Sequence, residues 1–113
     1  MHELGVMAEV IHMVEDELRE QNLTQVDQLV LEIGELSSVI PYYLEQCYPF
    51  AVRKTVLEKA VLEIEVIPAI GQCRACHKKF RVLKSSLKCP YCQSHSWELF
   101  GGRELLIKEI VAR

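Results

Sequence analysis

The sequence predicts an α+β fold, in which a three-stranded sheet carries two helices on one face and an insertion precedes the last strand. Three observations predict this fold. Apolar residues recur at helical spacing near the start of the chain, apolar and polar residues alternate in later segments, and two Cys-x2-Cys pairs come before a final alternating segment. We therefore expect residues 1–70 and 103–113 to form an α/β core and residues 71–102 to form an inserted module.

The first two elements follow from the spacing of apolar residues. A helix is expected over about residues 4–21, because apolar residues recur three and four positions apart, at Leu4, Met7, Ile11, Val14 and Leu18. His12 lies off this stripe and is expected at the surface. A strand is expected over residues 26–34, with one face made of Leu29, Leu31 and Ile33.

Prolines and alternation predict the remaining elements. Pro41 fits the first turn of a second helix, whose buried side is expected to hold Ile40, Tyr43, Leu44, Cys47 and Ala51. Pro49 removes a backbone hydrogen bond, so a bend or an early end is expected there. A strand is expected over residues 61–67, with the side chains of Leu62, Ile64 and Val66 facing the core. Residues 104–111 should form the third strand, and the other face of the sheet should be partly solvated, with Glu32, Glu63 and Glu65.

Composition excludes several classes of protein. Half of the 113 residues are hydrophobic and 26% are charged, which is typical of a packed domain and not of a disordered chain. No apolar run approaches the ~18 residues that a membrane helix needs, and acidic residues throughout the first helix exclude a secretory signal. We therefore expect a cytoplasmic protein without membrane contact, whose five cysteines are metal ligands or core residues and not disulfides.

The charge of the chain is divided unevenly. Between Gly71 and Gly102, six basic residues stand against Glu98 alone, which gives +5, whereas the remainder holds seven basic and fifteen acidic residues, which gives −8. The two values together reproduce the net charge of −3. Two substructures of opposite electrostatic character are therefore expected.

The cysteine pairs have the spacing of a zinc ribbon. Cys73 and Cys76 are separated by two residues, and Cys89 and Cys92 repeat this spacing after twelve more. Four thiolates can converge tetrahedrally on Zn²⁺, and so short and polar a segment buries too little surface to fold without the metal. The pattern therefore predicts a structural zinc site in an inserted zinc-ribbon module.

Other interpretations of this segment have less support. A thioredoxin-type redox pair needs a strand-to-helix context that is missing here. His77 and His95 adjoin the cysteines, and an exchange of a cysteine for His95 stays open, although both are more simply exposed residues of the ribbon. Cys47 is expected to fill the core. The basic residues would suit RNA or DNA, but the acidic net charge and the lack of an alternating basic–aromatic pattern oppose nucleic-acid binding.

The first residues, Met-His-Glu-Leu, can build a second metal site. The α-amine and the amide nitrogen of His2 close a five-membered chelate ring, that amide and the imidazole Nδ1 close a six-membered ring, and the amide of Glu3 can add a fourth nitrogen. Four nitrogens in a plane suit Ni²⁺ or Cu²⁺. The site needs a free amine and hence a retained Met1, which the bulky His2 favours. Taken alone, an ordinary helix start is the simpler explanation of these residues.

Five stretches, taken in order, resemble the HypA/HybF family of hydrogenase maturation factors. They are the initial MHE, LEIGELSSV, LEIEVIPA, the paired cysteine motifs and the final LIKEI, and they span essentially the whole chain. The resemblance implies a nickel metallochaperone in which Met1, His2 and Glu3 hold Ni²⁺. It also implies that structural zinc is held by Cys73, Cys76, Cys89 and Cys92.

The same resemblance implies the partners of the protein. They are a maturation GTPase and the large subunit of [NiFe]-hydrogenase, with no nucleic acid, and a weak homodimer stays open. Some relatives place a carboxylate near the position of Ile40 that assists nickel, but this chain has none there, so whether that loop supplies a fifth ligand stays open. The sequence contains no nucleophile–base pair and no phosphate-binding loop, so the protein is not expected to be an enzyme.

Overall fold

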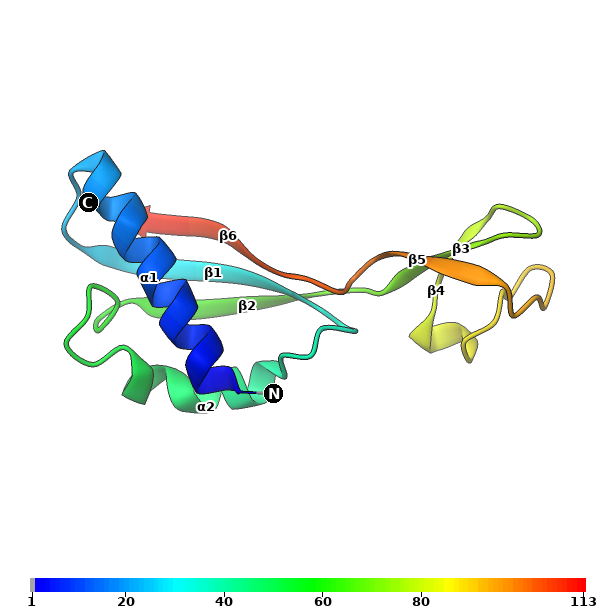
Figure 1. The fold of residues 1–113 in the computed structure, drawn as a ribbon, viewed down its shortest axis with the longest axis horizontal. Coiled ribbons are helices and arrows are strands. Elements are labelled where there is room, and N and C mark those ends of the chain that lie inside the picture. The colour runs from blue at the N-terminus through cyan, green and yellow to red at the C-terminus, as the bar shows by residue number, and fades with distance from the viewer. Residues whose placement is uncertain (1) are drawn as a thin grey trace.

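The computed structural model describes residues 2–113 and contains two three-stranded sheets that lie end to end (Figure 1). The elements are α1 (Glu3–Gln21), β1 (Val26–Gly34), α2 (Pro41–Ala51), β2 (Val61–Ile67), β3 (Ile70–Cys73), β4 (Lys79–Arg81), the 3₁₀ turn η1 (Leu83–Ser85), β5 (Trp97–Gly101) and β6 (Leu105–Ala112). The molecule is elongated, with extents of 53 × 26 × 17 Å. Within residues 2–113, no helix is both long enough and apolar enough to span a membrane.

The first sheet contains the strands of the predicted core in the order β2-β1-β6. β1 pairs in parallel with β2, as in Leu31 opposite Ile64, and antiparallel with β6, as in Leu31 opposite Ile107. Because β6 returns to this sheet after the cysteine segment, that segment is an insertion between two strands of one sheet. This arrangement confirms the predicted α+β fold.

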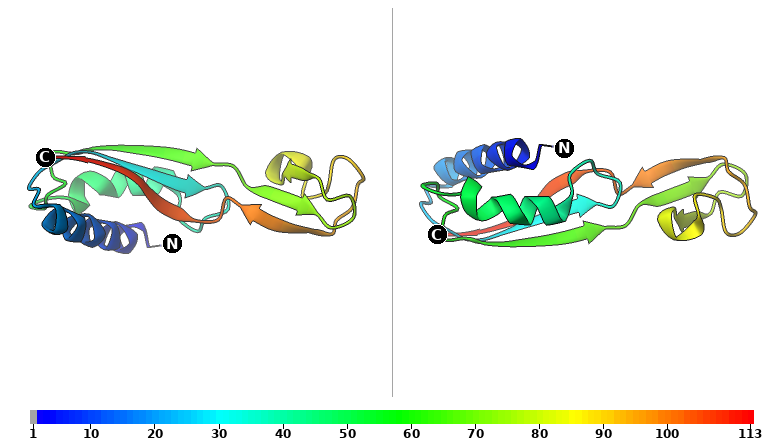
Figure 2. Two further views of the ribbon diagram at one scale, coloured as in Figure 1. Left: turned by 90° about the horizontal axis from the view of Figure 1, so that it is seen from above. Right: turned by 90° about the horizontal axis from the view of Figure 1, so that it is seen from below.

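Both helices cover one face of this sheet and enclose the main hydrophobic core (Figure 2). Leu29, Leu31 and Ile33 of β1 are fully buried beneath them, as the alternation predicts. The first turn of α1 differs from the prediction, because Leu4 is 50% exposed and Glu3 is buried. Both residues flank the helix face on which Met7 lies, and the carboxylate of Glu3 finds a hydrogen-bond donor on the inside, as described below.

Two further predictions of buried side chains were wrong in part. On α2, Leu44 and Tyr48 are the buried residues, with Cys47 and Ala51 partly buried, whereas Ile40 and Tyr43 are 45% and 53% exposed. Ile40 precedes the first turn of α2, so its side chain does not follow the helical face. On β2, Leu62 and Ile64 pack against the core but Val66 is 55% exposed, because this edge strand is packed against the core only in its first half.

The second sheet, in the order β4-β3-β5, belongs to a small unit that we call the ribbon, residues 70–101. Its strands are antiparallel, and its buried set is small, consisting of Cys73, Phe80, Val82 and Cys89. The Trp97 ring packs edge to face on Phe80, and its Nε1 donates a hydrogen bond to the Leu87 carbonyl at 2.8 Å. Two of the four buried residues are candidate metal ligands, so little of the ribbon's interior is independent of the cysteines.

A close contact between backbones joins the two sheets. Gly34, at the end of β1, lies so near the backbone of Gly102 that any side chain at position 34 would overlap it. Gly102 lies equally close to Ala69 and has a φ of +95°, a conformation that favours glycine. The Leu36 N–H donates to the Gly102 carbonyl at 2.8 Å, which ties the loop after β1 to the same point.

Glu35 adds a charged connection across this junction. One carboxylate oxygen accepts a hydrogen bond from the Ala69 N–H at 2.7 Å, and the other accepts one from Arg81 Nη2 at 3.3 Å. Arg81 belongs to β4, so a residue from the loop after β1 holds the ribbon directly. The side chain of Glu35 is only 22% exposed, which makes this a partly shielded ion pair.

Candidate metal centres

The four cysteines of the two Cys-x2-Cys pairs converge in the ribbon. Their sulfur atoms all lie within 4.8 Å of one another, with Sγ–Sγ distances of 3.5 Å from Cys73 to Cys92 and 3.6 Å from Cys76 to Cys89. A tetrahedral ion with Zn–S bonds of ~2.3 Å requires sulfur–sulfur distances of ~3.8 Å. The sulfur positions therefore fit a four-thiolate Zn²⁺ site.

The two cysteine pairs have the same backbone conformation. In the first, the His77 N–H donates to the Cys73 carbonyl at 3.0 Å, and the Cys73 N–H donates to the Lys78 carbonyl at 3.0 Å. In the second, Gln93 and Ser94 take the equivalent places around Cys89, with both distances 2.9 Å. His77 and Gln93 have φ of 65° and 66°. Each cysteine pair is thus followed by a residue in the left-handed conformation, which closes the turn around its two sulfurs.

The four sulfurs affect one another's ionisation, and a bound cation would allow all four to be deprotonated. N–H groups of Cys76 and Ala75 donate to the Cys73 sulfur at 3.4 and 3.3 Å, and these bonds lower the pKa of the Cys73 thiol to about 6. The pKa of Cys92 moves the other way: the Ser94 N–H lowers it, but the neighbouring thiols and burial together raise it to about 12. Sulfurs this close oppose one another's ionisation. A bound divalent cation removes that opposition and deprotonates all four thiols.

Neither ribbon histidine joins this cluster. His77 and His95 are exposed, and the only group of metal-ligating side chains that gathers within residues 2–113 is the four cysteines. Cys47 lies apart on α2, partly buried against the core, and its thiol donates to the Leu44 carbonyl at 3.4 Å. Burial and the nearby Glu3 carboxylate raise the pKa of the Cys47 thiol, which keeps it protonated.

The predicted N-terminal site is described in part, because Met1 lies outside the described residues. His2 is exposed and immediately precedes α1, and its side chain makes no capping hydrogen bond to the helix. The His2 carbonyl accepts the first intrahelical bond, from Val6 N–H at 3.0 Å. The amide of Glu3 belongs to the first turn, where N–H groups have no acceptor within the helix. The imidazole of His2 and the amide of Glu3 are thus not used by the helix.

The side chain of Glu3 has a structural contact that the sequence did not reveal. Its carboxylate accepts a hydrogen bond from the Ile40 N–H at 3.1 Å, at the N-cap position of α2. This bond is the main reason why the pKa of Glu3 lies below its ordinary value, although burial opposes the shift. The carboxylate therefore ties the start of α1 to the start of α2, and it makes no described contact with the imidazole.

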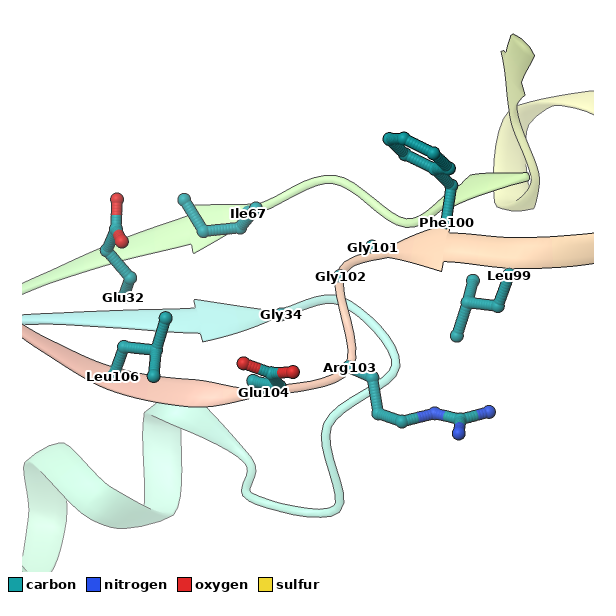
Figure 3. A pocket seen from close by; sticks show the side chains of 10 residues that line it. All are labelled: Glu32, Gly34, Ile67, Leu99, Phe100, Gly101, Gly102, Arg103, Glu104 and Leu106. Carbon is teal, nitrogen blue, oxygen red and sulfur yellow. The ribbon is translucent and has the colours of Figure 1, made fainter. Parts of the chain in front are cut away.

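The N-terminal end and the cysteine cluster are separate places in the molecule. The start of α1 lies beside the start of α2, on the helical face of the core, whereas the end of β3, which is Cys73, lies in the ribbon at the other end of the molecule (Figures 1 and 2). A groove of about 400 Å³ lies at the junction of the two sheets, where Gly34 and Gly102 are part of its lining (Figure 3). Its carboxylates, Glu32 and Glu104, point in different directions and form no metal-ligating group.

Comparison with known proteins places the chain in a family. A family model described as "Hydrogenase/urease nickel incorporation, metallochaperone, hypA" matches residues 1–112. The chain belongs to the HypA family. It is 36% identical over 110 residues to the hydrogenase maturation factor HypA of Dechloromonas aromatica, with 97% of each chain covered. It is also 36% identical to that of Trichodesmium erythraeum, over 97% of this chain and 94% of the other.

Solved HypA structures share the fold of the chain. The solution structure of the Ni metallochaperone HypA from Helicobacter pylori aligns with a TM-score of 0.71 at 20% identity, over 99% of this chain and 97% of the other. A second solution structure of a HypA protein gives a TM-score of 0.73 at 21% identity, over 100% and 97%. Family membership makes the protein a nickel metallochaperone of hydrogenase maturation, and the predicted resemblance is confirmed.

Proposed function

We propose that the protein binds Ni²⁺ at its N-terminus and delivers the ion to the large subunit of a [NiFe]-hydrogenase. The α-amine of Met1, the amide and imidazole nitrogens of His2 and the amide of Glu3 are the proposed ligands. The observation that carries this proposal is the placement of His2, which is exposed directly before a helix whose first amides have no internal acceptor. Three of these nitrogens close two fused chelate rings and the Glu3 amide adds a fourth, a set that favours a square-planar ion over tetrahedral Zn²⁺.

The position of this site suits both binding and release. Residues at a chain terminus make few packed contacts, so a ligand can leave without disturbing the core. The carboxylate of Glu3 stays on Ile40 in this scheme and keeps the start of α1 in place, while only its amide faces the ion. Docking on a partner would present the ion to competing ligands, such as thiolates of the target. A maturation GTPase is the second proposed partner.

The four cysteines are proposed to hold a structural Zn²⁺ and not the transported nickel. Their sulfur spacing suits a closed tetrahedral site, which leaves no open position for exchange. When bound, zinc supplies the folding free energy that the small buried set of the ribbon lacks. We propose residues 71–102 as the zinc-dependent unit and residues 1–70 with 103–113 as the nickel-binding core. The protein is further proposed to act in the cytoplasm, without enzymatic activity.

Substitution of His2 tests the nickel site. His2→Ala should weaken nickel binding by more than about 100-fold, because it removes the imidazole ligand and the chelate ring that this ligand closes. His12→Ala is the matched control, since His12 is an exposed histidine of the same helix. Nickel titrations of zinc-loaded, untagged protein measure the affinity. The absorption spectrum shows whether the bound Ni²⁺ is the planar, diamagnetic form. Equal affinity of the two variants would contradict the proposal.

A second experiment tests the amine alone. Two residues added before Met1 move the α-amine away without changing a side chain, and tight nickel binding should be lost while zinc content stays constant. Nickel binding that survives both changes would leave the alternative, a zinc-ribbon module for nucleic-acid or protein interaction with an incidental N-terminus.

A further inference from the structure

One surface of the ribbon combines exposed aromatic rings with lysines. We call it the lysine–aromatic strip and define it as Lys78, Lys79, Tyr91 and Phe100. Tyr91 and Phe100 are each 60% exposed, although large aromatic side chains usually seek burial. Phe100 also lines one end of the junction groove, where its ring stands clear of the backbone (Figure 3). Exposed rings of this kind gather at sites of protein interaction.

The lysines of the strip lie over the rings. Lys79 Nζ is 3.7 Å from the centroid of the Phe100 ring, and Lys78 Nζ is 4.7 Å from that of Tyr91. A cation over a ring face is held there by the ring quadrupole. Among residues 2–113, neither lysine forms an ion pair with a carboxylate, whereas Arg74 pairs with Glu98 and Arg81 with Glu35. The two ammonium groups are therefore positioned but not neutralised.

A groove of about 360 Å³ borders both cation–ring pairs of the strip, because one member of each pair lines it. Lys79 and Tyr91 both line it, and its remaining lining is mostly apolar, with Ile70, Phe80 and Pro90. Arg81 also lines the groove, with its guanidinium already held by Glu35. The strip thus offers positive charge at Lys78 and Lys79, and the groove beside Lys79 and Tyr91 has room for an apolar side chain.

We propose that the lysine–aromatic strip binds an acidic segment of a protein partner, one that carries an apolar side chain beside its carboxylates. The carboxylates would meet Lys78 and Lys79, and the apolar side chain would enter the groove. This surface is independent of the nickel site. The acidic core does not cancel its attraction, because the molecule is 53 Å long and charges are screened within ~8 Å in physiological salt.

The same geometry disfavours a nucleic acid as the occupant. Single-stranded nucleic acids are held by stacking of their bases on exposed ring faces. Here an ammonium group lies over the face of each ring, so a base would first have to displace it. Carboxylates need no such displacement, since the outward N–H groups of each ammonium remain available.

Binding of model ligands to the zinc-loaded full chain tests the proposal. The probe is a short peptide of glutamate and leucine residues, compared with a peptide in which lysine replaces glutamate and with an oligothymidylate. The glutamate peptide should bind and should shift the backbone NMR signals of residues 78–81 and 90–91. Its affinity should fall as the salt concentration is raised. Lys79→Glu should weaken it about fivefold or more, and Phe100→Ala about threefold.

Lys59→Glu is the matched control, because it makes the same charge change at an exposed site on the core. The proposal is overturned by no binding of the glutamate peptide, by equal binding of the lysine peptide, by tighter binding of the oligothymidylate, or by an equal effect of Lys59→Glu. Nickel affinity should be the same in Lys79→Glu and the parent protein, so failure here and failure of the nickel site are distinguishable. Zinc content and NMR dispersion verify that each variant is folded.

Discussion

At the scale of single residues, Glu3 has two separable roles. Its amide is a proposed nickel ligand, whereas its carboxylate accepts the Ile40 N–H at 3.1 Å and holds the starts of both helices together. A carboxylate at the N-terminus of α2 is also favoured by the dipole of that helix. The nearby Cys47 thiol stays protonated, because burial and the negative charge of Glu3 both raise its pKa. A carboxylate so placed should affect stability more than nickel affinity.

The first prediction separates these roles by Glu3→Gln. The variant keeps the amide and a neutral acceptor but loses the charge, so thermal unfolding should occur at lower temperature while nickel affinity stays within about twofold. The pKa of Glu3 is lower in the folded protein than in the unfolded chain, where it is ~4.3. The ionised carboxylate therefore stabilises the folded protein fully above pH ~4.3, and this stabilisation is lost as the pH falls through the lowered pKa. The difference between the two proteins should therefore be constant from neutral pH down to about pH 5 and shrink below it.

Glu9→Gln is the control for this measurement, because Glu9 is exposed on the same helix. A difference in unfolding temperature that grows as the pH falls would have the wrong sign and would exclude the Ile40 bond as its source.

The second prediction concerns the pH dependence of nickel binding. Ligands must be deprotonated to bind a metal, so protons compete with nickel for the imidazole and the amine of the proposed site. Between pH 7.5 and 6.0 the nickel dissociation constant should rise about tenfold or more, which calorimetric titration of the zinc-loaded protein measures. One unchanged constant over this range would speak against an imidazole–amine site.

At the scale of elements, α2 shows how far a local pattern can be followed. Proline inside the helix predicts an early end, and α2 ends at Ala51, two residues after Pro49. The buried face was predicted less well, since Tyr48 and not Tyr43 enters the core. The hydroxyl of Tyr48 donates to the Ala60 carbonyl at 3.0 Å and approaches that of Leu57 at 3.4 Å. Those carbonyls lie in the turns that follow the helix, and no helical periodicity reveals them.

The third prediction is that Tyr48→Phe loosens these turns. Removal of the hydroxyl takes its donor from the Ala60 carbonyl, whereas the Leu57 carbonyl keeps the Ala60 N–H at 2.9 Å. The loss should cost about 1 kcal/mol and lower the unfolding temperature by about 4 °C. Burial raises the pKa of Tyr48 to about 12, so its hydroxyl stays protonated and the effect should be the same from pH 6 to pH 9. Tyr43→Phe, at a ring that is 53% exposed, should have no measurable effect in the same thermal unfolding experiments.

The elements that the sequence predicts well are those governed by one local rule. Alternation placed Leu29, Leu31 and Ile33 correctly in the core, and Cys-x2-Cys spacing identified the four sulfurs that cluster. The errors at Leu4, Ile40 and Val66 lie at element ends or on an edge strand, where coverage by other elements decides burial. Contacts between distant segments, such as Glu3 with Ile40 and Glu35 with Arg81, have no sequence signal, because they depend on the packing of whole elements.

At the scale of the whole molecule, the ribbon and the core differ in what keeps them folded. The core buries the faces of two helices against a sheet, whereas the hydrophobic cluster of the ribbon has four buried residues, of which Cys73 and Cys89 are proposed zinc ligands. Without a cation, the four close thiols do not all ionise: the pKa of Cys73 is lowered to about 6, whereas the neighbouring thiols and burial raise that of Cys92 to about 12. The ribbon should therefore depend on zinc and the core should not.

The fourth prediction follows from this difference. Removal of zinc by a chelator at neutral pH should collapse the NMR dispersion of residues 70–101, because metal binding supplies much of the ribbon's folding free energy. The signals of α1 and α2 and the helical circular dichroism should persist. Restored dispersion on return of zinc is the control for irreversible damage. A ribbon that stays dispersed without zinc, or a core that unfolds with it, would refute this division.

The last prediction concerns how the ribbon is held against the core. Glu35 is the one side chain of the loop after β1 that bonds both the Ala69 backbone and the Arg81 guanidinium. Arg81 is 41% exposed, so solvent screens the ion pair and its contribution should be about 1 kcal/mol. Glu35→Gln should therefore loosen the junction without unfolding either unit. The ¹⁵N relaxation rates of residues 70–101 should then depart from those of the core, because the two units tumble more independently.

The backbone contact between Gly34 and Gly102 limits the size of this effect, since it persists in the variant and should keep the two sheets adjacent. Glu98→Gln is the matched control: it removes an exposed ion pair with Arg74 inside the ribbon and should leave the relaxation rates of both units alike. If Glu35→Gln also leaves them alike, the glycine contact alone orients the ribbon. The charged connection would then contribute nothing to how the ribbon is held against the core.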